Sequence, residues 1–513
     1  MTYLIGIDIG TSGTKGLLID SGGKVHARAS ASYPLTTPKP LWVEQDPEDW
    51  WRATVEVCNG LLKESGVTAD QIKGVGLTGQ MHGLVILDRN NKVLRPCILW
   101  NDQRSGEECA AITSKVGKKR LLEITGNPVL PGFTAPKILW VRTHEPGVYR
   151  QIAHVLLPKD YIRFRLTGEY VSDVSDASGM SVLNVRGRTW AGELLDELEI
   201  PKSWMPSVVE SPAVSATVND AAAAETGLAK GTPVVGGAGD NAAGAVGSGV
   251  VRPGVLSVSI GTSGVLFAHS DQYRIEPEGR LHSFCHAVPG AWHLMGVTLS
   301  AGGSLRWFRD TFCESEITKA QQAGKDPYEL MMEEANGVPA GSEGLLFLPY
   351  LTGERTPYPD PHARGSFVGL TIRHTKAHLI RSVLEGVAFS LRDCHELMKA
   401  LGLKIDTVRA TGGGARSPVW LQIIADVFNA EIATVSTSEG TSFGAALLAG
   451  VGAGVFSSVP EASEQTVKVV SSVQPNRNNV PAYEEMYRVY HSSYQALKPL
   501  TDPLSGDKKR ASS

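Results

Sequence analysis

Asp8 is the first residue of this chain whose type and position could do chemistry, because it lies at the end of an apolar run of strand length. An ionised carboxylate that is buried without a partner is costly, so Asp8 is expected at an exposed edge, in an ion pair or facing a cation. The turn after it, residues 10–14, combines two glycines with hydroxyl residues and can aim successive backbone N–H groups at a phosphate. Taken alone, an ordinary hairpin with a solvent-facing Asp8 explains these residues equally well.

The sequence of this turn recurs later in the chain. Residues 261–264 repeat residues 10–13 after an offset of 251 residues, and both copies lie between two apolar runs. A repeat in the same strand–turn–strand context indicates two related halves. Two copies also favour a phosphate-binding function, because one polyphosphate could be gripped from both halves.

A second acidic residue, Asp240, follows an apolar strand and several glycines and precedes Asn241 and a small-residue helix, residues 242–246. One explanation is a helix N-cap. The other is a carboxylate at the C-terminal edge of a strand, where α/β proteins bind ligands. Residues 237–242 also fit the dinucleotide fingerprint, but the next acid is Asp271, so the ribose-binding acid is missing and an oxidoreductase is disfavoured.

Two further segments are weaker candidates. Three glycines at 412–414 precede a helix start at Ser417, which suits the phosphate or sugar edge of a nucleotide, although tight strand–helix packing is the preferred explanation for this segment alone. His82 lies in a polar loop, residues 79–83, between two strand-like runs, and could bind a polyol hydroxyl. With 13 histidines in the chain, a structural role is preferred for His82 alone. The sequence has no P-loop, protein-kinase or G-x-S-x-G hydrolase signature.

The composition limits the class of protein. The 513 residues are 42% hydrophobic and 20% charged, which supports a folded core, and the net charge of −4 argues against binding nucleic acid through a broad basic surface. The six cysteines form no C-x-x-C pair, so neither a disulfide framework nor a zinc site is expected. The cysteines are expected to be buried free thiols. The N-terminus reads unlike a signal peptide and no uncharged apolar stretch reaches 18 residues, which predicts a soluble, cytoplasmic protein.

The elements that must position these residues alternate between strands and helices, which favours α/β architecture. Residues 3–20 are expected to form a β-hairpin. Helices are expected to begin after Asp46 and after Ser417, each of which is followed by proline. Residues 483–497 carry aromatic and apolar side chains at helical spacing, which indicates core packing rather than a ligand site.

Together these motifs resemble those of the FGGY carbohydrate kinases, within the actin and hexokinase superfamily. Residues 132–140 look like the first family signature, and residues 365–370 followed by 378–385 look like the second. The resemblance covers nearly the whole chain, and its elements occur in the order of the family.

Within the family, residues 80–83, 100–104 and 239–244 look most like members that phosphorylate D-xylulose. Glycerol kinases carry an Arg-Glu pair where Met81 and His82 stand here, so glycerol is disfavoured.

The resemblance implies two ribonuclease-H-like α/β domains around a central cleft that closes by a hinge. Residues 1–248 would form the N-terminal, sugar-binding domain and residues 249–500 the C-terminal, ATP-binding domain, with a flexible tail at 501–513. ATP would be the co-substrate, with Mg²⁺ bridging the phosphate oxygens and offsetting their charge.

The resemblance also assigns site residues. Asp240 would be catalytic and accept the proton of the sugar hydroxyl late in the transfer, because a carboxylate with a pKa near ~4 cannot remove it beforehand. Asp8, also catalytic, would hold the metal–phosphate assembly through water. The sugar would be bound by Met81, His82, Asp240 and Asn241. The nucleotide would be bound by Thr11, Gly261, Thr262, Gly302, Gly303, Gly413 and Ser417.

The sequence therefore predicts an ATP-dependent kinase of a small sugar, with D-xylulose as the acceptor and D-xylulose 5-phosphate as the product. The alternatives are a sibling kinase of ribulose, another ketose or a polyol, and an actin-like ATPase without a small-molecule acceptor. The loop at 79–83 and the Asp240-Asn241 pair favour the enzyme over the ATPase, because an ATPase scaffold has no need of polyol-binding groups there. No nucleic-acid or membrane partner is expected. The oligomeric state, with a homodimer as one alternative, and the strictness of the sugar choice stay open at this stage.

Overall fold

A computed structural model describes residues 2–437 and 439–505, and the chain divides into two compact units. Unit 1 comprises the described residues up to Arg252, together with His269–His293 and Thr437–Lys468. Unit 2 comprises Pro253–Ala268, Leu294–Ser436 and the described residues from Val469 onward.

Unit 1 is built on one large sheet with the strand order β13-β14-β5-β1-β2-β3, and β15 also pairs with β5. Its strands are β1 (Tyr3–Ile9), β2 (Gly13–Asp20), β3 (Val25–Ser32), β4 (Glu44–Gln45), β5 (Ile72–Gly79), β6 (Val85–Leu87), β7 (Cys97–Ile98), β8 (His154–Leu156), β9 (Val171–Asp173), β10 (Leu183–Asn184), β11 (Thr189–Trp190), β12 (Ser207–Val209), β13 (Val214–Thr217), β14 (Pro233–Val235), β15 (Ala238–Gly239) and β18 (His282–Cys285). Its helices are α1 (Pro47–Ser65), α2 (Gly106–Val116), α3 (Lys118–Thr125), α4 (Thr134–His144), α5 (Pro146–Tyr149), α6 (Pro158–Thr167), α7 (Val174–Ala177), α8 (Gly192–Glu197), α9 (Asp220–Thr226), α10 (Asp240–Ser248), α16 (Gly440–Gly452) and α17 (Val459–Thr466).

The predicted hairpin is confirmed: β1 and β2 are antiparallel, with Asp8 opposite Lys15 and Ile9 opposite Thr14. On its other side β1 runs parallel to β5, with Asp8 opposite Thr78. The predicted helix after Asp46 is α1, and the Asp46 side chain accepts a hydrogen bond from the Glu48 amide as an N-cap.

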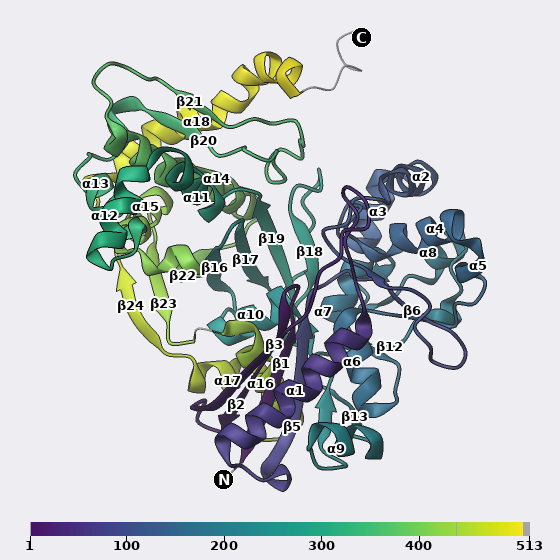
Figure 1. Cartoon of the computed structure of the whole chain (residues 1–513). Helices are drawn as coiled ribbons and strands as arrows, with labels where there is room; N and C mark the ends of the chain where they lie inside the picture. The colour runs from purple at the N-terminus through teal and green to yellow at the C-terminus, as the bar shows by residue number, and fades with distance from the viewer. Residues whose placement is uncertain (1, 438, 506–513) are drawn as a thin grey trace. The chain divides into compact units, whose positions relative to one another are not determined.

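Helix α16 comes late in the sequence but lies on the first strands of unit 1 (Figure 1). Its backbone touches theirs because glycine stands at the contact points. A Cβ at Gly6 of β1 would lie 1.9 Å from the Ser442 carbonyl oxygen, and one at Gly76 of β5 would lie 1.9 Å from the Ala445 carbonyl oxygen. Side chains at either position would push the helix off the sheet.

Unit 2 is built on a second large sheet, in which strands run in the order β19-β17-β16-β22-β23-β24. Its strands are β16 (Gly254–Ile260), β17 (Gly264–Ser270), β19 (Trp292–Thr298), β20 (Leu346–Leu348), β21 (Ser366–Val368), β22 (Ile405–Thr411), β23 (Glu431–Val435) and β24 (Val469–Val473). Its helices are α11 (Gly302–Phe312), α12 (Glu314–Ala323), α13 (Pro327–Asn336), α14 (Lys376–Ala400), α15 (Pro418–Phe428) and α18 (Val480–Thr501).

The two sheets repeat one plan. In unit 1 the hairpin β1–β2 is followed by β5 parallel to β1, and in unit 2 the hairpin β16–β17 is followed by β22 parallel to β16. The repeated Gly-Thr-Ser-Gly turn therefore belongs to a repeat of the fold, and the predicted α/β class is confirmed.

The remaining elements agree with the sequence pattern. Helix α15 begins after Ser417, and the aromatic stripe lies on α18. The tail predicted from 501 starts with a single 3₁₀ turn at Asp502–Ser505, and residues 506–513 lie outside the described part of the chain. All six cysteines are buried and unpaired with one another, as expected. None of the helices within residues 2–437 and 439–505 combines the length and the apolar character needed to cross a bilayer.

Candidate active site

Two predicted site carboxylates, Asp8 and Asp240, meet at one edge of the unit 1 sheet. Asp8 lies near the end of β1, and Asp240 is the first residue after β15. Both strands run parallel to β5 and pair with Thr78 at its C-terminal end. Ligands of α/β proteins bind at this edge, because the polar residues that follow parallel strands collect there.

The carboxylate of Asp240 is oriented by its neighbour. Its Oδ1 accepts hydrogen bonds from the Asn241 backbone N–H at 2.7 Å and from Asn241 Nδ2 at 2.8 Å. The N-cap of α10 is Gly239 rather than Asp240, so the capping explanation for this acid does not hold in the structure. The carboxylate is thus held by one residue, Asn241, and Asp240 remains partly exposed.

The surroundings of the two acids disfavour their charges. Burial, with the Asp8 carboxylate as the second cause, raises the pKa of Asp240 to about 7. Burial also raises the pKa of Asp8, against the opposing hydrogen bond from Thr441 Oγ1, which is 2.7 Å from Asp8 Oδ2. The sequence-based picture of a carboxylate with an ordinary pKa is therefore corrected: a base whose pKa lies near neutrality takes a proton more readily.

A divalent cation fits this pair of acids. Asp8 Oδ1 is buried with no hydrogen-bond partner within the described chain, and hard cations such as Mg²⁺ prefer carboxylate oxygens. The described residues contain no group of three or more His, Cys, Asp or Glu side chains suited to a metal ion. A metal held through few protein ligands and several waters agrees with both observations.

The predicted sugar loop lies against the same edge. Met81 is buried, and a Cβ on Gly239 would lie 2.9 Å from its Cγ, so the loop packs directly on the residue before Asp240. His82 is half-buried and its ring Nδ1 lies 2.8 Å from the Gly179 carbonyl oxygen. The structure therefore brings Asp8, Met81, His82, Asp240 and Asn241 together within unit 1.

Thr11, predicted to bind phosphate, connects the unit 1 hairpin turn to its surroundings. Its hydroxyl donates to Gln80 Oε1 at 3.2 Å and accepts from Trp100 Nε1 at 3.0 Å, while its carbonyl accepts from Gln45 Nε2 at 2.7 Å. These bonds fix the turn to the segment that carries Met81.

Unit 2 contains a pocket of about 770 Å³ beside its own hairpin turn. The pocket is lined by five of the six unit 2 residues predicted for the nucleotide: Gly261, Thr262, Gly302, Gly413 and Ser417. The sixth, Gly303, is not among the lining residues.

Gly302 and Gly303 are predicted from the sequence to bind the nucleotide, and in the structure their backbone amides make hydrogen bonds to the neighbouring hairpin turn. The Gly302 N–H donates to the Gly261 carbonyl at 2.8 Å, and the Gly303 N–H donates to the Thr262 carbonyl at 3.0 Å. These two amides therefore brace the turn of the hairpin. Ser417 likewise has a structural task, because its side chain caps α15 by accepting from the Trp420 N–H.

Several residues of both sites escape sequence reasoning. Thr441 contacts Asp8 although 433 residues separate them, and its only sequence signal is its place at the start of a small-residue helix. Tyr328, Met332 and Asn336 line the unit 2 pocket from α13. Their spacing on an amphipathic helix is also that of ordinary core packing, so no motif marks them.

Comparison with known proteins identifies the chain. The model of the FGGY family of carbohydrate kinases matches it with the N-terminal domain at residues 3–247 and the C-terminal domain at residues 256–453. The chain belongs to the FGGY family of carbohydrate kinases. As a member of this family it is an enzyme that uses a sugar and ATP, and the two-unit α/β fold is that of the family.

Individual relatives resemble the FGGY chain over nearly its whole length. The xylulose kinase of Bacillus subtilis is 40% identical over 509 residues, which cover 99% of this chain and 100% of that protein. The gluconokinase of the same organism is 32% identical over 504 residues, covering 97% and 98%. The crystal structure of xylulose kinase from Rhodospirillum rubrum matches with a TM-score of 0.90 at 33% identity, covering 97% of this chain and 99% of that one.

The unit 2 pocket yields a steric prediction. A Cβ on Gly413 meets only Arg416 Nη2, at 3.9 Å, and its backbone is not left-handed, so Gly413→Met should fold and place its side chain in the pocket. We expect KM for ATP to rise by about tenfold or more, because overfilling a packed site costs about 1–3 kcal/mol. Steady-state kinetics measure it. Gly192→Met, at an open position of unit 1, is the control, and an unchanged KM for ATP in Gly413→Met would remove the nucleotide from this pocket.

The raised pKa of Asp240 yields a stability prediction. Asp240 loses its proton near pH 3.8 in the unfolded chain and near pH 7 in the folded chain. The free energy of unfolding therefore falls as the pH rises from about 3.8 to 7. Asp240→Asn should therefore stabilise the metal-free protein by up to about 4 kcal/mol at pH 8 and by about 2 kcal/mol at pH 5, because each pKa unit corresponds to about 1.36 kcal/mol. Denaturant unfolding at both pH values tests this. The exposed Asp220→Asn on α9 should change little, and an equal gain at both pH values would contradict the assignment.

Proposed function

We propose that the protein transfers the γ-phosphoryl group of ATP to D-xylulose, giving D-xylulose 5-phosphate and ADP. The observation that carries the proposal is the packing of the Met81–His82 loop on the residue before Asp240, which supports a sugar site beside the proposed base. The 40% identity to a xylulose kinase over nearly full length supports the same acceptor.

In this proposal Asp240 acts on the acceptor hydroxyl. Its carboxylate, fixed by Asn241, orients the O–H and accepts its proton as the bond from oxygen to phosphorus forms and the bond from phosphorus to the bridging oxygen of ADP breaks. The raised pKa makes that proton transfer more favourable than it would be to an ordinary aspartate. His82, Met81 and Asn241 position the sugar.

The nucleotide is assigned to the pocket of unit 2, where Gly261, Thr262 and Gly413 are lining residues whose backbone would face a phosphate or ribose. Asp8 would hold Mg²⁺ through water, and a bound Mg²⁺ would offset the charge of the phosphate oxygens. Thr441 keeps Asp8 oriented toward that role through its 2.7 Å hydrogen bond. Thr11 is assigned to the phosphate side of the unit 1 turn.

Gluconate is the second candidate acceptor, because a gluconokinase is 32% identical over most of the chain. It differs from D-xylulose in carrying a carboxylate. Two half-buried acids, Asp8 and Asp240, disfavour a further negative charge close by, which is the physical reason for placing the ketose first.

An acceptor panel tests the proposed function. Purified protein with ATP and Mg²⁺ is assayed for ADP release with D-xylulose, D-ribulose, glycerol and gluconate. We expect the highest kcat/KM with D-xylulose, because the 79–83 loop differs from that of glycerol kinases at Met81 and His82. A higher kcat/KM with gluconate or D-ribulose would replace D-xylulose as the acceptor while leaving the kinase intact.

The role of Asp240 has its own test. Asp240→Ala should lower kcat by ~10²–10⁴, because it removes the group that takes the proton. The dissociation constant for ATP, measured by calorimetry, should stay unchanged, since the nucleotide is assigned to unit 2. Near-normal turnover in the variant would remove Asp240 from the mechanism.

A further inference from the structure

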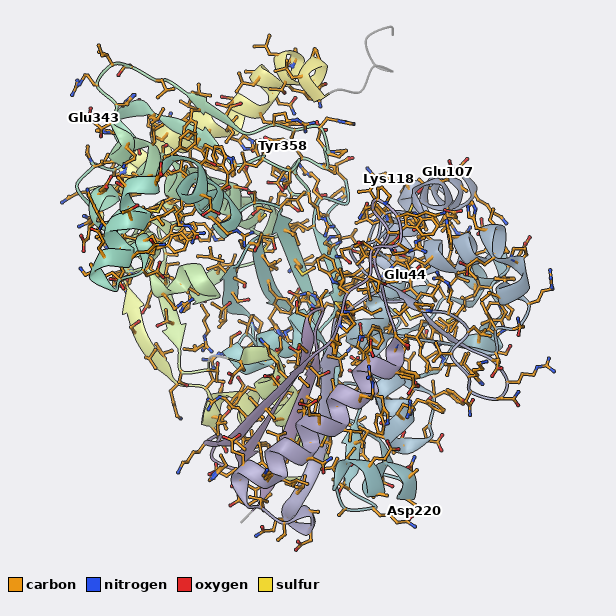
Figure 2. All side chains as sticks on the ribbon, viewed as in Figure 1. Glu44, Glu107, Lys118, Asp220, Glu343 and Tyr358 are labelled. Carbon is orange, nitrogen blue, oxygen red and sulfur yellow. The ribbon has the colours of Figure 1, made fainter. Side chains whose placement is uncertain are left out.

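Lys137 is a buried lysine to which the reaction described above gives no role. It lies on α4, where every residue from Thr134 to Val141 is buried, and it is the one charged side chain of that stretch. Its exposure is 0%, whereas charged side chains nearby in sequence, such as Glu107 and Lys118, lie at the surface (Figure 2). Burying an amine is costly unless hydrogen bonds compensate, so its contacts are informative.

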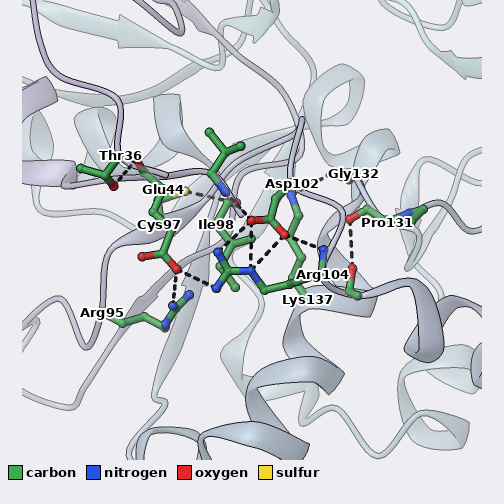
Figure 3. Close-up of polar contacts among 12 residues, drawn as sticks. Thr36, Glu44, Arg95, Cys97, Ile98, Asp102, Arg104, Pro131, Gly132 and Lys137 are labelled. Carbon is green, nitrogen blue, oxygen red and sulfur yellow. Dashed lines mark hydrogen bonds and ion pairs between the residues drawn. The ribbon is translucent and has the colours of Figure 1, made fainter. Parts of the chain in front are cut away.

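The Lys137 amine donates to two backbone carbonyls. Nζ lies 2.9 Å from the His82 oxygen and 2.7 Å from the Gly132 oxygen. Figure 3 shows it beside Asp102 and Arg104, and Asp102 is already engaged by Arg104 Nη2 at 2.7 Å. Burial lowers the pKa of Lys137 to about 7, and even the neutral amine keeps two N–H groups for these two carbonyls.

The contact with the His82 carbonyl stabilises an unfavourable backbone conformation. His82 has a φ of 69°, in the left-handed region that residues with a Cβ seldom adopt. Its carbonyl accepts a second bond from Thr134 Oγ1 at 3.0 Å, and its ring stacks on Phe133 with centroids 4.4 Å apart. Lys137 and Thr134, one turn apart on α4, thus hold the His82 peptide in this conformation.

The contact with Gly179 determines which ring nitrogen of His82 carries the hydrogen. A carbonyl oxygen only accepts, so the 2.8 Å contact with Gly179 requires a hydrogen on Nδ1 of His82. In the neutral ring Nε2 is then the acceptor. Gly179 allows this close contact because a Cβ there would lie 2.3 Å from His82 Nδ1.

We propose that Lys137 is a positioning residue for the sugar site: by holding the His82 carbonyl, it keeps the 79–83 loop in the conformation in which Nδ1 of His82 is bound to Gly179 and Nε2 is the acceptor of the ring. The inference deepens the proposed function and rests on its placing of the sugar at His82. Through the second carbonyl, at Gly132, Lys137 also connects the 79–83 loop to a segment that packs tightly on Trp100, because a Cβ on Gly132 would lie 2.4 Å from the Trp100 oxygen.

The test compares isosteric variants on α4. Lys137→Met removes both bonds and should raise KM for D-xylulose by about tenfold or more with an unchanged KM for ATP. Thr134→Val removes one bond to the same carbonyl and should shift KM for the sugar in the same direction by about threefold. Thr143→Val, which removes a hydroxyl bond to the Leu139 carbonyl on the same helix, is the matched control and should change neither.

A double-mutant cycle separates positioning from general damage. If Lys137 acts through His82, then adding Lys137→Met to His82→Ala should raise the sugar KM by less than twofold beyond His82→Ala alone. Equal effects of Lys137→Met in both backgrounds, or a rise in KM for ATP as well, would overturn the inference. Should Lys137→Met fail to fold, the same cycle with Thr134→Val decides, and additivity there overturns it.

The inference and the proposed function fail separately. If the wild-type enzyme prefers another sugar, the acceptor assignment fails, and the same variants are measured with the preferred sugar. A normal KM for that sugar in His82→Ala, or in Lys137→Met, then overturns the positioning role whichever sugar is used.

Discussion

The active-site edge of unit 1 depends on the contact of helix backbones through glycine. Helices α10 and α16 approach so closely that a Cβ on Gly247 would lie 1.9 Å from the Gly440 oxygen, and one on Gly444 would lie 1.9 Å from the Ala243 oxygen. The same helix α16 rests on β1 and β5 through further glycines. Because the N-termini of both helices are drawn to the end of β1, Asp240 and Thr441 are both brought to Asp8.

This packing places two carboxylates where both are harder to ionise. Burial is the first cause of the raised pKa of each, and the Asp8 charge adds to the raised pKa of Asp240. A fold selected for stability alone would gain from removing one charge. Groups that are held at such a cost are typical of functional sites, where a raised pKa serves proton transfer or a cation offsets the repulsion.

A second set of buried polar contacts holds the 79–83 loop, our proposed sugar loop, to this edge. Its support comes from Lys137 and Thr134 below the His82 carbonyl, and from Gly179 beside the ring. The unit 2 pocket, to which we assign the nucleotide, is built separately, and the amides of Gly302 and Gly303 on α11 brace the hairpin turn beside it. The two units thus share one sheet plan but differ in the groups beside it. Unit 1 carries polar side chains there, and unit 2 carries glycine backbone that lines a pocket.

The sequence by itself determined the features that short stretches of chain encode: the two hairpins with their repeated turn, the proline-led helices after Asp46 and Ser417, and the acids at the ends of apolar strands. Local chemistry suffices there, because turns and caps depend on neighbouring residues. Only the tertiary structure decided the partners of those acids, the near-neutral pKa of Asp240, the bracing role of the Gly302 amide and the contact of Lys137 with the His82 carbonyl. Each of these features follows from burial or from contact between segments far apart in the chain. Burial and long-range contact leave no local pattern in the sequence, so they cannot be predicted from short stretches of it.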